Sequence, residues 1–290
     1  MAPAVNPEEI VLLLADEYSR MAAAYDANVT PHFAPIAERV VGLADPRAGE
    51  SFLDLGAGTA LLACMIAPKV LPQGVVAIDL ADGALAAGTY RAARLGIKSI
   101  RFEMMDVRNI IYPGRRFDAV VSNLGIPAFG FDRCFAEVAR VLKSTGRFIF
   151  CEWGDFADPP YDALLRAVQR HRNPNPPKKL ADLRAAVAFY RQSDAMKAIR
   201  SPDRMKTALI SAGFRHVDVK TELHKAVFAP PETFIDFRMA WGANEAEFAG
   251  MAEPSRAAFL SEVKVELRRL AGGDRLEIDW LVHHYVAKLA

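Results

Sequence analysis

The sequence predicts an α/β fold with a doubly wound parallel sheet, and two observations lead to this prediction. From Ser51 onward, short apolar runs of strand-forming residues alternate with stretches rich in Ala and Leu. Such alternation is typical of a parallel sheet that helices cover on both faces. The second observation is the apolar run FLDL at 52–55, which is followed by GAG and then by a helix-like stretch. Glycines at such a point let the backbone turn tightly and approach a ligand at the start of a helix.

The elements of this core are expected in a regular order. Strands are predicted at 51–55, 75–79, 99–104, 117–122 and 146–152, with helices between them at 59–70, 82–95 and 131–142. After a helix at 202–212, which Gly213 is expected to end, the remaining strands are predicted at 216–220 and 280–288.

Three segments do not follow the alternation. Residues 7–44 look helical and precede the first strand, whereas 156–200 and 221–275 are predicted to be mostly helical insertions. The stretch NPNPP at 173–177 is predicted to be a loop, because its prolines cannot continue a helix. Ligands of open α/β sheets bind outside the carboxyl ends of the strands, where these insertions also emerge, so we interpret them as a lid or substrate cap. The alternative is that they extend the core or form a dimer face.

The composition favours a small-molecule partner. The chain has 52% apolar and 24% charged residues, and its 36 Lys and Arg nearly balance its 35 Asp and Glu. This is an ordinary globular composition, and it argues against nucleic acid or an anionic membrane, which usually demand a basic excess. The apolar run at 10–15 is far shorter than the ~20 residues that span a bilayer, so no membrane insertion is expected.

The cysteines and histidines indicate neither a disulfide framework nor a metal site. Cys64, Cys134 and Cys151 are scattered and form no CxxC pair, which is typical of reduced residues in a cytoplasmic protein. The six histidines show no HxxxH or similar spacing, so no metal is expected.

Acids at the ends of three predicted strands suggest which ligand the glycine turn binds. Asp79 ends the second strand, where a carboxylate can accept hydrogen bonds from the two hydroxyls of a ribose. Asp106, in EMMDVRN, follows the third strand and is placed to accept from an adenine amine. Asp54 lies inside the glycine turn, two residues before Gly56, where it would repel a pyrophosphate but suit the ammonium group of an amino acid. The pattern therefore favours S-adenosylmethionine over a nicotinamide dinucleotide.

The motifs FLDLGAGTA, VVAIDLADGAL, MMDVRNI, FDAVVSNLGIPAF and EVARVLKSTGRFIFCEW follow one another along 50–155. In order and spacing, the chain resembles the class I S-adenosylmethionine-dependent methyltransferases. More narrowly, it is similar to the group of the ubiquinone and menaquinone biosynthesis C-methyltransferases. This resemblance implies a Rossmann-like seven-stranded sheet whose last strand is antiparallel. Ala60 departs from the usual third glycine, and STG at 144–146 departs from the family's PGG.

The resemblance also implies a role for each matched residue. Those near the methionine moiety are expected to be Asp54, Gly56, Ala57 and Gly58. Asp79 and Leu80 are expected to bind the ribose, and Asp106 and Val107 the adenine. Asn123 and Leu124 are expected to face the methyl donor and the acceptor. Tyr25, in YSRMAAAYD at 18–26, belongs to a helix that resembles the one closing over the cofactor.

These implications divide the chain into four parts. They are an N-terminal helical cover at 1–50, a cofactor-binding core at 51–155, a helical lid at 156–200, and a C-terminal part at 201–290 that completes the core. The expected function is transfer of a methyl group to the oxygen, carbon or nitrogen of a small metabolite, with a homodimer possible. Two alternatives remain: a binding protein without transfer activity, and a nicotinamide-dependent oxidoreductase suggested only by the glycines and Asp79.

A general base is needed only if the acceptor carries a proton that is hard to lose. The candidates for that base are His32, Glu152 and His171, and for each a purely structural role is the alternative. Aromatic residues around the expected pocket favour a flat or hydrophobic acceptor, although most can equally belong to the core. They are Phe129, Phe131, Trp153, Tyr161, Phe189, Tyr190, Phe237 and Trp241.

Overall fold

The computed structural model describes residues 6–240 and 243–289, so that Trp241 lies outside the described residues. The chain divides into two compact units. A sheet unit comprises residues 33–155, 193–224 and those from 281 onward, and a helical unit comprises those up to 32, 156–192 and 225–280.

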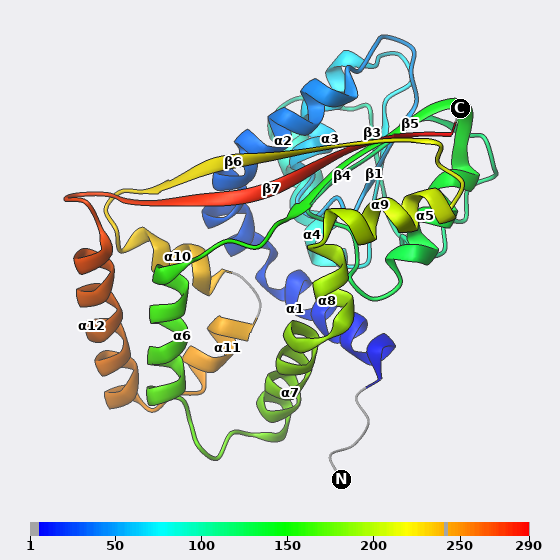
Figure 1. Cartoon of the computed structure of the whole chain (residues 1–290). Coiled ribbons are helices and arrows are strands. Elements are labelled where there is room, and N and C mark those ends of the chain that lie inside the picture. Colours follow the sequence, from blue (N-terminus) through cyan, green and yellow to red (C-terminus); the bar gives the residue numbers. More distant parts are fainter. Residues whose placement is uncertain (1–5, 241–242, 290) are drawn as a thin grey trace. The chain divides into compact units, whose positions relative to one another are not determined.

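A seven-stranded sheet, with the order β3-β2-β1-β4-β5-β7-β6, organises the fold (Figure 1). Strands β1 to β5 pair in parallel, whereas β7 runs antiparallel to β5. The predicted fold class is therefore confirmed, including the antiparallel last strand. The strands are β1 (Phe52–Leu55), β2 (Val75–Asp79), β3 (Ile100–Met104), β4 (Phe117–Asn123), β5 (Leu142–Trp153), β6 (His216–Phe228) and β7 (Leu276–Lys288).

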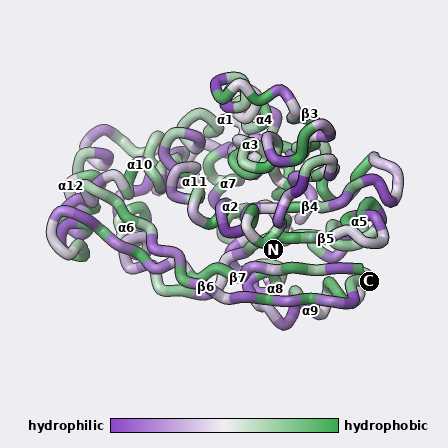
Figure 2. Tube along the Cα trace, turned by 90° about the horizontal axis from the view of Figure 1, so that it is seen from above, coloured by the Kyte–Doolittle hydropathy of each residue, from purple (hydrophilic) through white to green (hydrophobic). Residues whose placement is uncertain are grey.

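The middle strands of the sheet are buried because helices cover both faces. All four residues of β1 are buried, and β4 is buried at five of its seven positions. In β5 the hydrophobic run lies in the second half, whereas hydrophilic and hydrophobic residues alternate along the first part of β6 (Figure 2). Phe150 of β5 stacks on Tyr285 of β7, with ring centroids 4.4 Å apart. This aromatic pair helps to hold the antiparallel strand in register.

The helices of the sheet unit connect successive strands. Helix α5 buries Cys134, Phe135, Val138 and Val141, a spacing that places an apolar stripe on one side. The helices α3 and α4 follow the turns after β1 and β2. The helices are α2 (Thr30–Ala44, mostly in this unit), α3 (Leu61–Ile66), α4 (Asp82–Arg94), α5 (Phe131–Val141), α8 (Asp194–Ile199) and α9 (Pro202–Ser211).

Proline and capping residues set the starts of two helices in the helical unit. Asn6 caps α1 by accepting from the amide of Glu8 at 3.0 Å, and Asp158 caps α6 by accepting from the amide of Tyr161 at 3.0 Å. Each cap is followed by a proline, which suits the first helical turn. The predicted loop at 173–177 separates α6 from α7. The helices are α1 (Pro7–Asn28), α6 (Pro159–His171), α7 (Lys178–Gln192), α10 (Thr233–Met239), α11 (Ala243–Ala249) and α12 (Glu253–Leu270).

The predicted start of the second insertion is wrong. Residues 221–228 continue the strand β6, and the first helix of the insertion begins only at Thr233. Strand β7 is correspondingly longer than predicted and begins at Leu276. Both strands extend further than predicted because β6 and β7 are neighbours and each supplies backbone hydrogen-bonding groups to the other. The local sequence pattern does not show this pairing. The charged residues of β6 are tolerated because it is an edge strand.

Among the described residues, no helix is both long enough and apolar enough to cross a membrane.

Candidate functional site

The carboxyl ends of β1 and β4 meet at two glycines. Gly56 has a φ of 59°, and a Cβ atom there would lie 2.6 Å from the carbonyl oxygen of Gly125. A Cβ on Gly125 would in turn lie 2.8 Å from the carbonyl oxygen of Gly56. Both positions therefore exclude any side chain, and the two loops pack backbone against backbone. Gly125 was not predicted as a site residue, although its place just after a predicted strand was a detectable sign.

Asp54 is a buried acid with an unsatisfied oxygen. Its side chain lies in β1 with 1% of the residue exposed, and its Oδ2 has no hydrogen-bond partner among the described residues. Burial raises the pKa of Asp54 to about 8; the backbone amide of Ala63 opposes this shift, and the charge of Asp79 adds to it. A buried carboxylate oxygen of this kind is costly unless a donor or a cation meets it.

Asp79 ties the turn after β1 to the end of β2. Its Oδ2 accepts from the amide of Gly58 at 2.8 Å, and its Oδ1 accepts from the amide of Ala81 at 2.9 Å. Burial raises the pKa of Asp79, and these backbone hydrogen bonds work against that shift. The residue is half-buried, as are Ala57 and Leu80 beside it. The structure therefore brings together the residues predicted for the methionine and ribose moieties.

Ala60, at the position of the usual third glycine, adopts the left-handed conformation with a φ of 60°. That conformation costs an L-residue about 1–2 kcal/mol. The methyl group is accommodated because α4 carries Gly88 opposite it, where an added Cβ would lie 2.9 Å from the Cβ of Ala60. The departure from the family pattern is thus matched by a glycine on the neighbouring helix.

Asp106, after β3, is paired with an arginine that the sequence analysis did not identify. The Arg108 guanidinium donates to both carboxylate oxygens, at 3.1 Å from Nε and 2.8 Å from Nη2, and its side chain is only 6% exposed. Burial alone would raise the pKa of Asp106, but the hydrogen bonds and charge of Arg108 outweigh it and hold that pKa below its ordinary value. Val107, next to Asp106, is buried.

The loop after β4 carries backbone strain. Leu124 has a φ of 59°, which is rare for a residue with a large side chain and is typical of functional sites. Its amide donates to the carbonyl of Cys151 at 3.2 Å. The thiol of Cys151 donates to Oδ1 of Asn123 at 3.2 Å, so the adjacent strand orients the Asn123 amide.

Glu152 lies on β5 at the same end of the sheet as Asn123, because Asn123 pairs with Cys151. Its Oε1 accepts from the amide of Ile126 at 3.2 Å. Burial raises the pKa of Glu152 to about 8, and backbone hydrogen bonds from Ile126 and Trp153 reduce the shift. A carboxyl group with such a pKa exchanges its proton near neutral pH.

The remaining predicted residues, Tyr25, His32 and His171, belong to the helical unit. The His32 ring stacks on Phe228 with centroids 4.4 Å apart, and burial lowers the pKa of His32. Tyr25 lies edge-on to Tyr18.

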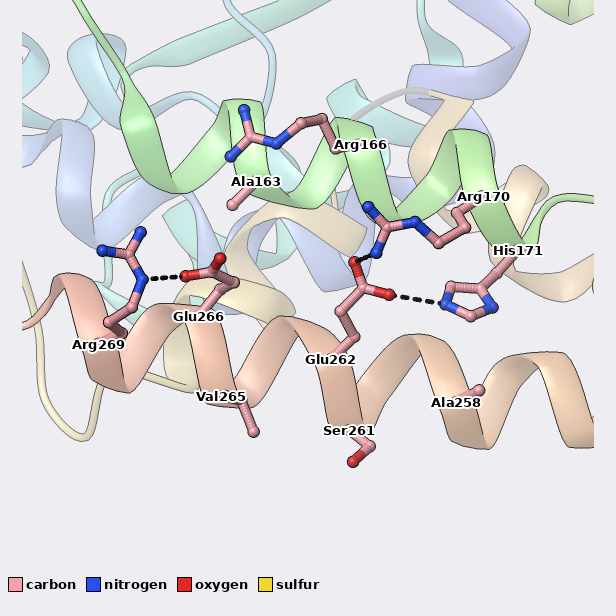
Figure 3. Close-up of a pocket in the computed structure, with 10 residues that line it drawn as sticks. All are labelled: Ala163, Arg166, Arg170, His171, Ala258, Ser261, Glu262, Val265, Glu266 and Arg269. Atoms are coloured by element: carbon pink, nitrogen blue, oxygen red, sulfur yellow. Dashed lines mark hydrogen bonds and ion pairs between the residues drawn. The ribbon is translucent and has the colours of Figure 1, made fainter.

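His171 lines an open groove between α6 and α12, with a volume of about 600 Å³ (Figure 3). Its Nε2 lies 2.8 Å from Oε2 of Glu262, and Arg170 contacts the other carboxylate oxygen. The same carboxylate therefore engages both basic side chains, and the charged groups of the groove are largely paired.

The chain resembles known methyltransferases in sequence. Residues 52–146 match a family described as a methyltransferase domain. The chain is 26% identical to nocamycin O-methyltransferase of Saccharothrix syringae over 94% of this chain and 97% of that protein. It is 31% identical to demethylmenaquinone methyltransferase of Clavibacter sepedonicus over 60% of this chain and 69% of that protein.

The fold also resembles solved structures. The YcgJ protein of Bacillus subtilis superposes with a TM-score of 0.54 over 88% of this chain and 98% of that chain. The identity is 16%, so this likeness concerns the fold.

The sequence relatives named above are methyltransferases, which supports the expected methyltransferase function over a nicotinamide-dependent oxidoreductase. The match at 31% identity spans more than two thirds of its relative, and the matched domain carries the glycine turn and the acids after β2 and β3. The chain therefore belongs to the class I S-adenosylmethionine-dependent methyltransferases, and it is an enzyme whose cofactor is S-adenosylmethionine.

Proposed function

We propose that this enzyme methylates a small, hydrophobic or aromatic metabolite and holds its cofactor at the carboxyl ends of β1 to β4. The observation that carries the proposal is the buried Asp54 oxygen without a partner. An ammonium group is the complementary ligand for it, because it supplies both charge and hydrogen-bond donors. Next to it, Gly56 and Gly125 leave no room for side chains, and no atom of the described residues lies within 4 Å of a Cβ built on Gly58. These residues fit an amino acid at the turn.

The other residues would hold the rest of the cofactor. Asp79 accepts hydrogen bonds from the backbone amides of Gly58 and Ala81 and, since a carboxylate offers about four lone-pair directions, it has acceptor capacity left for the ribose hydroxyls. Asp106 and Val107 would contact the adenine, and Arg108 would keep Asp106 ionised and oriented. When bound, S-adenosylmethionine supplies a methyl group that is already activated on a sulfonium. The protein then has to orient the acceptor and exclude water, and Asn123 and Leu124 would do so beside the donor.

Among the three candidate bases, we favour Glu152. Its pKa of about 8 suits proton transfer near neutral pH, and it shares its end of the sheet with Asn123. His171 is engaged by Glu262, and His32 is stacked on Phe228. If Glu152 acts as the base, methyl transfer should rise with pH until about pH 8 and then level off. Glu152→Gln should remove that dependence, which single-turnover rates across the pH range will measure. An unchanged profile would exclude Glu152.

A small organic acceptor is supported by one relative that spans most of the chain, a nocamycin O-methyltransferase. The near balance of basic and acidic residues supports action on a dissolved molecule and not on nucleic acid. A cytoplasmic location and a homodimer remain predictions, as does the division into a cover, a core and a lid.

The test of the proposal is titration calorimetry with S-adenosylhomocysteine, with NADH as the control ligand. Binding of S-adenosylhomocysteine alone is expected, and Asp79→Ala should weaken it by about 1.5–3 kcal/mol, the value of a hydrogen bond to a charged group. Transfer of a labelled methyl group to a panel of quinones, phenols and polyketide-like acceptors then identifies the acceptor class. Cofactor binding that is insensitive to both Asp54 and Asp79 would refute the site.

A further inference from the structure

Three potential metal ligands gather where β6 and β7 pair, at the edge of the sheet. Glu222 and His224 are two residues apart on β6, so their side chains lie on the same face. His284 lies on the neighbouring strand β7. One ligand atom from each of the three residues lies within 4.8 Å of the others. The sequence pattern could not identify this group, because its members come from two strands separated by an insertion.

The two imidazole rings approach each other closely. Nε2 of His224 lies 2.9 Å from Nε2 of His284. Two nitrogens bound to one tetrahedral Zn²⁺ at about 2.0–2.1 Å each are separated by about 3.3 Å, so a small separation of the rings from the present 2.9 Å would let both bind one ion. A hydrogen bond in which one ring donates to the other has a similar length, and it is the competing explanation. His284 is 1% exposed, and its Nδ1 has no partner among the described residues. The contact with His224 therefore satisfies only one of the two nitrogens of His284.

Glu222 is held in place by an arginine. Nε of Arg39, on α2, donates to Oε1 at 3.1 Å and to Oε2 at 2.9 Å, and its Nη2 donates to Oε1 at 2.5 Å. Carboxylates that bind metals are commonly oriented by such outer hydrogen bonds, and a carboxylate offers about four lone-pair directions. Arg39 also neutralises the charge of Glu222. The site would therefore attract an ion through its imidazoles and less through net negative charge.

The chemistry of the set indicates the class of ion. Imidazole ligands suit Zn²⁺, Co²⁺, Ni²⁺ and Cu²⁺, whereas Mg²⁺ and Ca²⁺ prefer sites made of oxygen ligands alone. The edge position gives access, because the described residues form no strand beyond β6 in the sheet and the Glu222 side chain is 32% exposed. We propose that Glu222, His224 and His284 bind one divalent transition-metal ion, with Arg39 orienting the carboxylate. This proposal revises the expectation of no metal and does not depend on the methyltransferase function.

The test uses the full chain without a polyhistidine tag, stripped with a chelator and titrated with Co²⁺ while visible absorption is recorded. We expect a saturable d–d spectrum at one ion per chain, and its displacement by Zn²⁺. Zn²⁺ affinity is then measured by competition with a chromophoric chelator. His224→Ala should weaken it by more than about 100-fold, since loss of even an outer partner of a metal site costs about 10–100-fold.

Matched variants distinguish loss of a metal ligand from a general effect of mutation on Zn²⁺ binding. Glu222→Gln should weaken Zn²⁺ binding while retaining a side chain of the same shape. His216→Gln changes an exposed histidine on the same strand and should leave Zn²⁺ affinity unchanged. Circular dichroism verifies that each variant is folded. His224 is chosen for substitution because it is half-buried, so replacing it disturbs the fold less than replacing the buried His284. Failure to bind Co²⁺ and Zn²⁺, or equal affinity in the wild type and His224→Ala, would show that the rings only share a proton.

Discussion

Two acids at the ends of strands β1 and β3 show opposite electrostatics. Asp54 is buried with one oxygen lacking a partner, and burial raises its pKa to about 8. Asp106 is paired with Arg108, and its pKa is held below the ordinary value. Among the described residues, no cation pairs with Asp54, whereas Asp106 is paired with the guanidinium of Arg108. Both residues are aspartates near the carboxyl end of a parallel strand, Asp54 within β1 and Asp106 two residues after β3, so the difference comes from the burial and the neighbours that the fold gives each acid.

The largest expected effect is on cofactor affinity at Asp54. Asp54→Asn should weaken S-adenosylhomocysteine binding by about 3 kcal/mol, roughly 100-fold, because a charged hydrogen bond in a buried site is lost. Titration calorimetry at pH 8 provides the measurement. A larger loss of S-adenosylhomocysteine affinity in Asp106→Asn than in Asp54→Asn would contradict the expected difference between the two acids.

Fold stability should respond in the opposite order. Asp106→Asn removes the carboxylate charge that pairs with the buried Arg108 and should lower the free energy of unfolding by about 2 kcal/mol. This is less than the 3–5 kcal/mol of a fully buried pair, because the Asp106 side chain is 27% exposed. Urea denaturation at pH 8 measures this change.

Asp54→Asn should stabilise the protein at the same pH. A carboxyl whose pKa is raised on folding contributes stability below its unfolded pKa of about 4, and this contribution is lost as the pH rises towards about 8. Asparagine does not titrate and avoids this loss. Destabilisation of similar size in both variants would remove the contrast between the two acids.

The pH dependence of binding gives a smaller effect. Below pH 8 the free enzyme holds Asp54 protonated, so binding of an ammonium group must release a proton. Affinity for S-adenosylhomocysteine should therefore increase by up to about tenfold, or 1.4 kcal/mol, per pH unit between pH 6 and pH 8. Calorimetry in buffers of different ionisation enthalpy counts the protons released, and Asp54→Asn should release fewer. A flat profile in the wild type would mean that Asp54 is already ionised.

The smallest effect is expected at the helix that supports the turn after β1. Gly88→Ala places a methyl group against Ala60 and should destabilise the protein by about 1 kcal/mol, the low end of overpacking. Ala60→Gly removes the contact, so the double variant should recover part of that loss. Urea denaturation of the two single variants and the double variant gives the coupling energy. Additive effects would indicate that Gly88 and Ala60 are independent.

Much of the proposed cofactor site could be predicted from local sequence patterns. Asp54, Gly56, Gly58, Asp79 and Asp106 were recognisable because each follows or ends a short apolar run, and parallel strands bring their carboxyl ends to one edge. The partners of these residues were not recognisable. Gly125 and Gly88 act through close approaches between separate loops and helices, and Arg108 is important because it is buried against Asp106.

The sequence by itself determined the order of strands and helices, the glycine turn and the acids after β2 and β3, because hydrophobic period and turn residues act over a few positions. The tertiary structure alone decided the length of β6, the pKa of each acid and the meeting of Glu222, His224 and His284. Pairing of distant strands and burial of charge depend on contacts between residues far apart in the chain, and such contacts leave no periodic trace in the sequence.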